Sequence, residues 1–495
     1  MYLLGIDVGT SSIKVALVEA DTQKVICTAQ YPENEAEIIS LKPEWAEQDP
    51  NNWWHDVQKA IIKVTSQNRA AAAAIKAIGI AYQMHGLVLV DKNQQALRNS
   101  IIWCDSRAVD LGNKAFEDIG REKCLSNLLN SPGNFTASKL AWVKQNEPHV
   151  YGQIYKMMLP GDFIAMKLTG QVTTTVSALS EGILWDFKNK TTAADVIKCY
   201  DLETAHIPEL VPLFSEHGRL NSDVAVKLGL PANIPVTYKA GDQLNNALSL
   251  NVMRPGEVAA TAGTSGVIYG VSDQLKADKL SRVNTFAHVN YSKEKEYTGV
   301  LLCINGVGSM YRWAKQQWAP NLTYQEINQL SSTSLVGSNG LKVLPFGNGA
   351  ERMLNNKHTG AQLLNISLNT NNSADVFRAV QEGIAFSFRY GLDIMRSNGL
   401  HPNVIRAGLA NLFLSETFVQ TFVDVTQTPV ELFYNDGSVG AALGAGIGAK
   451  IYNNEQEAFN NLKPIKTVLP KNSDTYESIY QEWMQILTHK LNESN

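Results

Sequence analysis

The chain has 495 residues, of which 44% are hydrophobic and 18% are charged, and its formal net charge at pH 7 is −4. That length exceeds a single typical hydrophobic core and predicts a globular protein with two domains. The slightly acidic balance argues against nucleic acid or an anionic membrane as the main partner.

The cysteines and the first residues bear on where the protein works. Five cysteines are scattered along the chain without a CxxC pair, which predicts reduced thiols in a cytoplasmic protein rather than a disulfide framework or a zinc site. Met1 leads directly into an apolar run, which leaves no room for a signal peptide. No apolar run approaches the roughly 20 residues that a membrane span requires. We therefore expect a cytoplasmic location.

The first residues predict a β-hairpin with a polar turn. Residues 2–6 and 13–18 are apolar runs, the turn between them contains Gly9-Thr10-Ser11, and Asp7 stands where the first strand ends. Backbone N–H groups and hydroxyls suit an anion, and a carboxylate beside them suits a hard cation. The turn is a candidate site for a magnesium–nucleotide phosphate tail, although the stretch alone is equally well explained as an ordinary hairpin. Lys14 could reach such a phosphate, but a solvated lysine is the simpler interpretation.

Strand-like and helix-like segments alternate through the first half, which is typical of an α/β domain. The segment at 101–107 contains Asp105 and Arg107, whose simplest use is an internal salt bridge. Beyond the hairpin, strands are expected at 27–31, 75–81, 87–90, 101–107 and 234–240, and helices at 50–67 and over most of 108–169.

Polar residues follow the strand expected at 75–81. Gln83, Met84 and His85 come directly after it. His85 can exchange a hydrogen bond with a sugar hydroxyl, and Met84 can pack on the carbon face of a sugar. Considered alone, His85 is better explained as a half-buried structural histidine.

Asp242 is the first candidate for a catalytic base. It follows the strand at 234–240 and a glycine, so its carboxylate is expected at the carboxyl end of a strand, where α/β sites are built. Phosphoryl transfer to an alcohol needs a carboxylate within reach of the hydroxyl. An N-cap of the following helix is an equal alternative, and the two roles can coexist.

The second half repeats the plan of the first hairpin. Residues 257–271 have the pattern of strand, turn and strand, with Gly263-Thr264-Ser265 in the turn. Two such hairpins, one in each half, predict an internal duplication in which two phosphate loops face each other across a cleft.

Further elements of the second half surround possible binding residues. An amphipathic helix is expected at about 373–396, ended by Asn398-Gly399. A strand at 404–407 leads into Gly408-Leu409-Ala410-Asn411. The small residues at 437–446 predict a helix start that permits close packing or the approach of a ligand.

Other catalytic motifs are missing from the sequence. There is no Ser-His-Asp order or G-x-S-x-G elbow, and neither a Walker loop nor a dinucleotide fingerprint is present. Glu351 and Arg352 follow a glycine-containing loop and are expected to form a structural pair.

Together these segments resemble the FGGY family of carbohydrate kinases, and within it the xylulokinases, over nearly the whole chain. Any one motif is weak, but the ordered set is specific for the family. The stretches that carry the resemblance are GIDVGTS at 5–11, EWAEQDP at 44–50, GIAYQMHG at 79–86, IWCDSR at 102–107, KLAWV at 139–143, GDQ at 241–243, GTSG at 263–266, QEG at 381–383 and GSVGAALG at 437–444.

The resemblance implies an α/β, two-domain, actin-like (ribonuclease-H-like) duplicated fold with a central cleft. It implies a sugar-binding domain over 1–247, a nucleotide-binding domain over 256–450 and a helical tail over 451–495. The implied reaction is ATP- and Mg²⁺-dependent phosphorylation of a ketopentose, D-xylulose to D-xylulose 5-phosphate. The sequence leaves open whether the chain acts alone or as a homodimer.

The resemblance also implies roles for single residues. Asp242 would be the general base that accepts the 5-hydroxyl proton, and Asp7 would bind magnesium. The residues expected around the sugar are Gln83, Met84, His85, Asp242 and Gln243. Those expected around the nucleotide are Gly9, Thr10, Ser11 and Lys14 in the first phosphate loop, Gly263 and Thr264 in the second, and Gly408, Ala410 and Asn411 at the adenine pocket.

Two positions depart from the family pattern, and other functions stay open. Gln243 stands where many xylulokinases carry Asn, and Leu409 adds bulk to the adenine-side glycine motif. One alternative is another FGGY substrate, such as ribulose, gluconate or another polyol. Others are an actin- or chaperone-like ATPase, against which the sugar-facing residues argue, and a sugar-binding regulator without catalysis, against which Asp7 and Asp242 argue.

Overall fold

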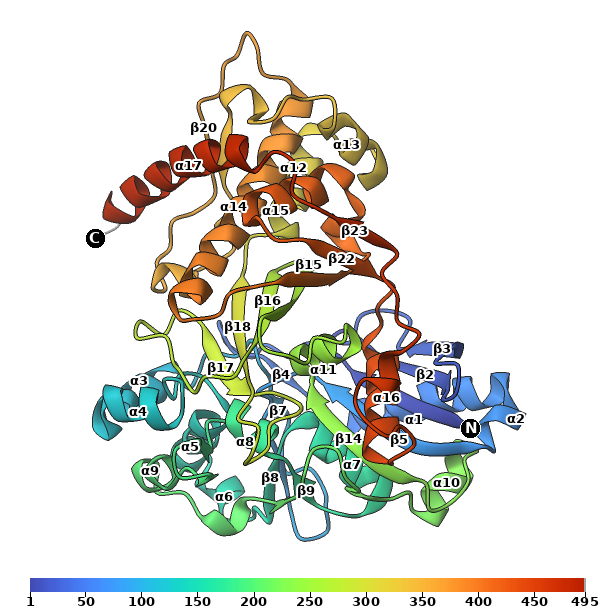
Figure 1. Cartoon of the computed structure of the whole chain (residues 1–495). Helices are drawn as coiled ribbons and strands as arrows, with labels where there is room; N and C mark the ends of the chain where they lie inside the picture. The colour runs from blue at the N-terminus through green and yellow to red at the C-terminus, as the bar shows by residue number, and fades with distance from the viewer. Residues whose placement is uncertain (494–495) are drawn as a thin grey trace. The chain divides into compact units, whose positions relative to one another are not determined.

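The computed structural model describes residues 1–493, and its packing divides the chain into two compact units (Figure 1). Unit 1 contains Met1–Met253, Phe286–Thr298 and Asp436–Leu462. Unit 2 contains Arg254–Thr285, Gly299–Asn435 and the chain from Lys463 onward. Segments far apart in the sequence therefore build each unit.

Unit 1 contains a six-stranded sheet with the order β13-β14-β5-β1-β2-β3. β2 pairs antiparallel with both β1 and β3, whereas β5 pairs in parallel with both β1 and β14. The strands expected from the sequence in this sheet are all present. They are β1 (Tyr2–Val8), β2 (Ile13–Glu19), β3 (Val25–Tyr31), β5 (Ile75–Tyr82) and β14 (Pro235–Gly241). The sequence analysis did not predict the remaining strand, the two-residue β13 (Gly218–Arg219).

The two faces of this sheet are covered by different helices, as the alternation of side chains along a strand requires. Ile6 of β1 and Ile80 of β5 belong to a core that also holds residues of α1 (Pro50–Gln67) and α7 (Pro160–Thr169). On the other face, α16 (Gly437–Gly448) packs against β1, β5 and β14 (Figure 1).

Glycines in the strands allow α16 to approach the sheet. A Cβ on Gly5 would lie 1.7 Å from the carbonyl oxygen of Ser438, and one on Gly79 would lie 2.0 Å from that of Ala441. Such distances are far inside van der Waals contact, so only glycine permits this backbone-to-backbone packing. The expectation that residues 437–446 serve close packing is confirmed.

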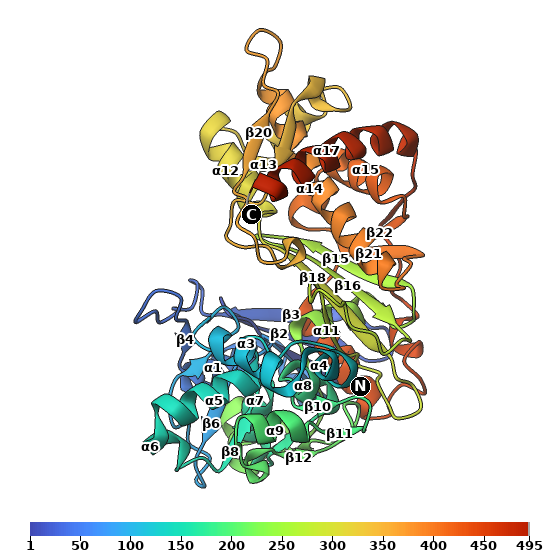
Figure 2. The ribbon, with the colours of Figure 1, turned by 90° about the vertical axis from the view of Figure 1, so that its left-hand side faces the viewer.

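The rest of unit 1 consists of further helices and short strands, several of which are labelled in Figure 2. Its helices are α2 (Arg69–Ala72), α3 (Val109–Ile119), α4 (Arg121–Asn127), α5 (Thr136–Asn146), α6 (Pro148–Tyr151), α8 (Val176–Glu181), α9 (Ala194–Cys199), α10 (Ser222–Leu228), α11 (Asp242–Ser249), η1 (Thr204–His206) and η5 (Glu457–Phe459). Its short strands are β4 (Glu47–Gln48), β6 (Val88–Val90), β7 (Ser100–Ile101), β8 (Lys156–Met158), β9 (Thr173–Thr174), β10 (Trp185–Asp186), β11 (Thr191–Thr192) and β12 (Glu209–Leu210).

The strand expected at 101–107 is much shorter than its sequence suggests. Only Ser100–Ile101 forms β7, and the chain then turns, with the N–H of Asp105 donating to the carbonyl of Ile102 at 3.2 Å. The Asp105 carboxylate accepts the N–H of Arg107 at 2.9 Å. A side chain that takes over backbone donors in this way competes with strand pairing.

Unit 2 repeats the plan of unit 1 on a seven-stranded sheet with the order β17-β18-β16-β15-β21-β22-β23. The hairpin β15–β16 is antiparallel and β15 pairs in parallel with β21, as β1–β2 and β5 do in unit 1. This shared arrangement confirms the duplication. The strands are β15 (Glu257–Ala262), β16 (Gly266–Ser272), β17 (Asn284–Ala287), β18 (Thr298–Ile304), β21 (Val404–Gly408), β22 (Val430–Phe433) and β23 (Lys466–Val468).

Helix α14 (Ser373–Ser397) is the centre of the unit 2 core. It begins at a capping box formed by Asn372 and Asp375, and most of its residues are buried. The last helix, α17 (Ser473–Glu493), packs into the same core through the fully buried Trp483. The other elements are α12 (Gly308–Trp318), α13 (Tyr324–Ser331), α15 (Glu416–Thr426), β19 (Lys342–Leu344), β20 (Gln362–Leu364), η2 (Ser338–Gly340), η3 (Arg352–Leu354) and η4 (Asn411–Leu414).

Within residues 1–493, no helix is both long enough and apolar enough to span a membrane.

Candidate functional site

The turn between β1 and β2 is held in place by side chains from other segments. Thr10 Oγ1 donates to Gln83 Oε1 at 3.2 Å and accepts from Trp103 Nε1 at 3.0 Å. Gln48 Nε2 donates to the carbonyl of Thr10 at 2.8 Å, and Gln83 Nε2 donates to Gln48 Oε1 at 3.0 Å. The geometry of this turn is thus fixed by the protein itself. Gln83, an expected sugar ligand, has both ends of its amide engaged in that support.

Asp7 and Asp242 lie at the same edge of the unit 1 sheet. β1 and β14 flank β5, with Asp7 opposite Ala81 and Gly241 opposite Tyr82 in register. Asp242 is the first residue of α11 and follows Gly241, which is the N-cap. The alternative that Asp242 is itself the cap is therefore wrong, and its carboxylate stands at a strand end, where the sequence predicts a site.

Burial and neighbouring carboxylates raise the pKa values of Asp7 and Asp242. Burial raises the pKa of Asp7 to about 6, with a further rise from Asp436 and an opposing effect of Lys14. Burial raises the pKa of Asp242 to about 7, with a further rise from Asp7, while hydrogen bonds from Gln243 oppose it. Acidic groups that repel one another in this way form a natural location for a cation.

The N-terminus of α16 lies against the Asp7 carboxylate. A Cβ on Gly437 would come within 2.3 Å of Asp7 Oδ2. Asp436 caps the helix by accepting the N–H of Ser438 at 2.8 Å, and Asn245 Nδ2 donates to the carbonyl of Gly437 at 2.9 Å. A helix N-terminus favours anionic groups, so this end of α16 suits a phosphate as well as the carboxylates.

No group of three or more His, Cys, Asp and Glu side chains within residues 1–493 is arranged to hold a metal ion. Magnesium is usually held by one or two carboxylates together with phosphate oxygens and water. Asp7 and Asp436 fit that kind of site. After burial, the charge of Asp436 is the next cause of the raised pKa of Asp7, and a bound cation would relieve that repulsion.

Met84 and His85 lie next to the strand end that carries Asp242. A Cβ on Gly241 would lie 2.6 Å from Met84 Cγ, so Met84 packs directly on the backbone before Asp242. The His85 ring packs between Phe135 and Phe286, with centroid distances of 4.8 and 5.3 Å. The structure therefore brings these two expected sugar residues together with Asp242 in one unit.

Gln243 presents a buried polar atom without a protein partner. It lies on the first turn of α11, and within the described chain nothing hydrogen-bonds to its Oε1 atom. A buried acceptor left unsatisfied costs about 1–3 kcal/mol. The hydroxyl of a ligand would remove that cost, which supports Gln243 as a polar contact for a small molecule.

Two buried ionisable residues beside His85 were not singled out by the sequence analysis. Lys139 Nζ donates to the carbonyls of His85 and Ile102 at 3.0 and 2.9 Å, and burial lowers its pKa to about 7. Glu181 accepts the N–H of His85 at 3.2 Å. Lys139 belongs to the KLAWV stretch that carries the family resemblance, but no local pattern reveals its contact with His85. Glu181 gives no sequence signal either, since both contacts depend on tertiary packing.

Asp105 and Arg107 form the internal salt bridge that the sequence favours. Their Oδ2 and Nη2 atoms are 2.6 Å apart, and Arg107 Nη1 lies 2.6 Å from Glu47 Oε1. The guanidinium also stacks 3.8 Å above the Trp45 ring. This pair therefore supports the fold.

Glu351 and Arg352 also make contacts that support the fold. Glu351 is buried and accepts the N–H of Asn305 through both carboxylate oxygens, at 2.9 and 3.1 Å. Burial raises its pKa to about 7. Arg352 bonds to Asn284 in the same unit.

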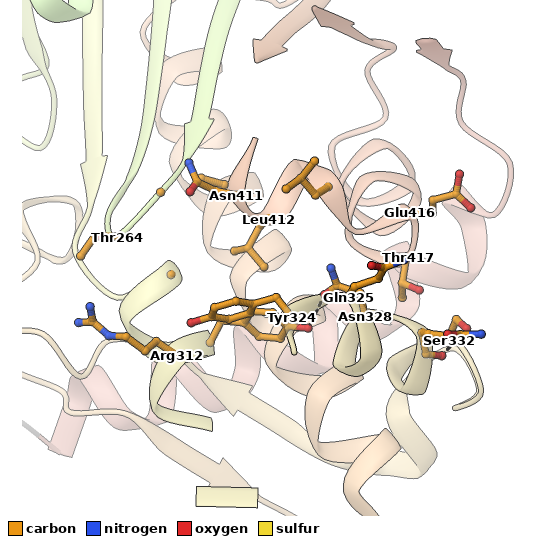
Figure 3. A pocket seen from close by; sticks show the side chains of 16 residues that line it. Thr264, Arg312, Tyr324, Gln325, Asn328, Ser332, Asn411, Leu412, Glu416 and Thr417 are labelled. Carbon is orange, nitrogen blue, oxygen red and sulfur yellow. Dashed lines mark hydrogen bonds between the residues drawn. The ribbon is translucent and has the colours of Figure 1, made fainter. Parts of the chain in front are cut away.

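Unit 2 contains a cavity of about 900 Å³ (Figure 3). In Figure 3 Thr264 and Arg312 lie at one end, Tyr324 and Leu412 in the middle, and Ser332 at the other end. Its lining residues are Ala262, Gly263, Thr264, Gly308, Tyr311, Arg312, Tyr324, Gln325, Asn328, Gln329, Ser332, Asn411, Leu412, Leu414, Glu416 and Thr417.

Some of the nucleotide-binding residues expected in unit 2 line the cavity, and the others lie beside its wall. Gly263, Thr264 and Asn411 line the cavity. Gly408 and Ala410 are not among the lining residues; instead the N–H of Ala410 donates to the carbonyl of Gly408 at 2.8 Å, which shapes the turn before Asn411.

The second Gly-Thr-Ser turn lies against the start of α12. The N–H groups of Gly308 and Ser309 donate to the carbonyls of Gly263 and Thr264 at 2.9 and 3.1 Å. The turn and the helix N-terminus therefore form one wall of the cavity. This arrangement matches a helix N-terminus beside a glycine-containing loop, which commonly binds phosphate.

Comparisons with known proteins identify the family of the chain. The models of the FGGY family of carbohydrate kinases match residues 2–249 with the N-terminal domain and 258–449 with the C-terminal domain. The chain therefore belongs to the FGGY family of carbohydrate kinases and is a sugar kinase. A xylulose kinase of Staphylococcus epidermidis is 30% identical, covering 98% of this chain and 96% of that protein.

Solved structures of this family share the fold. The xylulose kinase from Rhodospirillum rubrum has a TM-score of 0.88 at 24% identity and covers 99% of both chains. The gluconate kinase from Lactobacillus acidophilus has a TM-score of 0.90 at 20% identity, covering 100% of this chain and 99% of that one. The expected two-domain, actin-like and ribonuclease-H-like fold is thereby confirmed.

Proposed function

We propose that the protein transfers the γ-phosphoryl group of ATP to the 5-hydroxyl of a ketopentose, with D-xylulose as its substrate. Xylulose kinases related over nearly the full length support this choice of sugar. The observation that carries the proposal is the position of Asp242. Its carboxylate stands at a strand end beside Met84, and Gln243 offers an unpartnered acceptor one residue further on.

In this proposal Asp242 is the general base. It accepts the 5-hydroxyl proton while the hydroxyl oxygen bonds to the γ-phosphorus and the bond to the bridging oxygen of ADP breaks. A pKa of about 7, raised mainly by burial, suits this role, because a base works best when its pKa is near the working pH. Met84, His85 and Gln243 orient the sugar for the transfer.

Asp7 and Asp436 would hold Mg²⁺, which neutralises phosphate charge when it is bound. The turn at Gly9-Thr10-Ser11, fixed by Gln48 and Trp103, offers N–H groups and hydroxyls to the phosphates. Lys14 adds a positive charge near Asp7.

The cavity of unit 2 is the proposed site of the nucleoside. Tyr324 stacks on Tyr311 with a centroid distance of 6.0 Å, and an aromatic wall of this kind suits a purine. Gly263 and Thr264, in the turn that lies against the start of α12, would contact phosphate oxygens.

The test is a panel of D-xylulose, D-ribulose, D-gluconate and glycerol, each assayed for ADP release with ATP and Mg²⁺. We expect D-xylulose to give the highest kcat/KM and ATP hydrolysis without sugar to be slow. Preference for D-ribulose or D-gluconate would overturn the sugar and keep the kinase. Hydrolysis that sugar does not accelerate would favour an ATPase instead.

A further inference from the structure

Glu181 is a buried carboxylate that the proposed reaction does not use. It is the last residue of α8 and is 1% exposed. A carboxylate is rarely buried so completely, because losing its hydration is costly unless partners replace it. Its partners show what it holds.

The Glu181 side chain joins the end of β5 to the loop that follows it. Tyr82, the last residue of β5, donates its hydroxyl to Glu181 Oε1 at 2.7 Å. The N–H of His85 donates to Oε2 at 3.2 Å, and His85 Nδ1 lies 3.0 Å from the Glu181 carbonyl oxygen. One residue therefore contacts both the backbone and the ring of His85.

His85 needs such support because of its backbone conformation. Its φ is 62°, in the left-handed region that residues other than glycine seldom adopt. A residue in this region persists only where surrounding contacts fix it. Glu181 binds its N–H, and Lys139 and Thr136 bind its carbonyl at 3.0 and 3.3 Å.

The same carboxylate lies against the strand end that carries Asp242. A Cβ on Gly241 would be 3.4 Å from Glu181 Oε1 and 2.6 Å from Met84 Cγ. Burial raises the pKa of Glu181 well above its usual range, and the charge of Asp242 raises it further. Glu181 therefore touches the two backbone segments that present Met84, His85 and Asp242.

We propose that Glu181 is a positioning residue that sets His85 and the backbone before Asp242 for the sugar acceptor. This inference rests on the proposed function, since it takes His85 and Asp242 as sugar-facing. All of the contacts lie within unit 1, so the effect falls on the sugar and not on the nucleotide.

Two conservative variants of Glu181 separate the effect of the side chain's position from the effect of its charge. In Glu181→Gln the amide oxygen can accept the His85 N–H and the amide N–H can donate to the Tyr82 hydroxyl, so position is kept and charge is lost. In Glu181→Asp the charge is kept, but the side chain is one methylene shorter and draws away from His85. A buried hydrogen bond left unmade costs about 1–3 kcal/mol, which corresponds to about 5- to 150-fold in an equilibrium constant.

We expect Glu181→Asp to raise the KM for the sugar about 5- to 150-fold and Glu181→Gln to stay within about threefold of wild type. The KM for ATP should stay within about twofold in both. Tyr82→Phe is the matched control, because it removes the other partner of the carboxylate and leaves the His85 contact; its sugar KM should stay within about threefold. Thermal unfolding of each variant checks that the fold is intact.

Four results would overturn the inference. One is an unchanged sugar KM in Glu181→Asp. Another is equal loss in Glu181→Gln, which would mean that the charge matters rather than the position. The other two are an equal rise in the KM for ATP and a Tyr82→Phe variant as impaired as Glu181→Asp, either of which indicates a general structural role. The assays use whichever sugar the wild type phosphorylates best. An error in the choice of D-xylulose would therefore appear in the substrate panel of the wild type and would not affect the comparison of the variants.

Discussion

Gly437 and Asp7 are so close that no side chain fits between them: a Cβ at residue 437 would lie 2.3 Å from Asp7 Oδ2. The glycine is the first residue of α16, and the aspartate is the last residue but one of β1. The backbone of the helix start is therefore part of the surroundings of the carboxylate that we assign to magnesium.

Gly437→Ala tests whether this proximity matters for catalysis. The new methyl group can be accommodated if the Asp7 side chain swings away, so we expect a folded protein with about 10-fold or greater loss of kcat and a higher Mg²⁺ concentration at half-maximal rate. In an Asp7→Asn background the same substitution should have little further effect, because coupled residues are not additive. Additive losses would place the effect of Gly437 elsewhere.

Asp242→Asn should lower kcat about 10²- to 10⁴-fold, the usual contribution of a general base. Shape and size are kept, so sugar binding measured by calorimetry should remain. In the wild type, kcat should fall as the pH drops below about 7, because the base must be ionised and burial raises its pKa to about 7. A variant with near-normal kcat would remove Asp242 from the catalytic role.

The same raised pKa values make a prediction about stability. The folded-state pKa values of Asp7 and Asp242, about 6 and about 7, exceed the ordinary aspartate value of 3.8. The folded protein therefore binds more protons than the unfolded chain between those limits, and stability is lost as the pH rises through them. We expect Asp7→Asn/Asp242→Asn to unfold a few degrees higher than wild type at pH 8, with the difference vanishing near pH 4. Equal melting temperatures at pH 8 would show that the ionised pair is not destabilising.

Local patterns explain which parts of the fold and site could be predicted. The hairpin at 2–18 and its repeat at 257–271 follow from short apolar runs around Gly-Thr-Ser turns, and both are present. Asp242 could be placed because a strand, a glycine and a helix start are contiguous in the sequence. The opposite case is Glu181, whose partners Tyr82 and His85 are far away in the chain.

Tertiary contacts also explain why the strand predicted at 101–107 is wrong in its length. The apolar residues at 101–107 suggest a strand, but the carboxylate of Asp105 bonds to the N–H groups of Ala46 and Arg107 and turns the chain. No local pattern reveals that Ala46, a residue of another segment, competes for that side chain.

The cavity of unit 2 leads to a prediction about the nucleotide. Tyr324→Ala removes the exposed ring that stacks on Tyr311, and loss of an aromatic contact with a purine is worth about 0.5–1.5 kcal/mol. We expect the KM for ATP to rise about 2- to 10-fold with the sugar KM unchanged. Arg312→Ala, at the end of the cavity beside Thr264 (Figure 3), should weaken binding of ATP and ADP more than that of adenosine. Equal effects on sugar and nucleotide would contradict the assignment.

His85→Ala tests the identity of the sugar. Removing the ring leaves a sugar hydroxyl without its partner, which costs about 1–3 kcal/mol and should raise the KM for D-xylulose about 5- to 150-fold. The KM for ATP should change little, and sugars with a different hydroxyl at the contacted carbon should lose less. His206→Ala is the matched control, since it removes a buried histidine that packs on Tyr151 at 5.2 Å. If His85→Ala raises the two KM values equally, or if the control matches it, then His85 supports the fold and does not recognise the sugar.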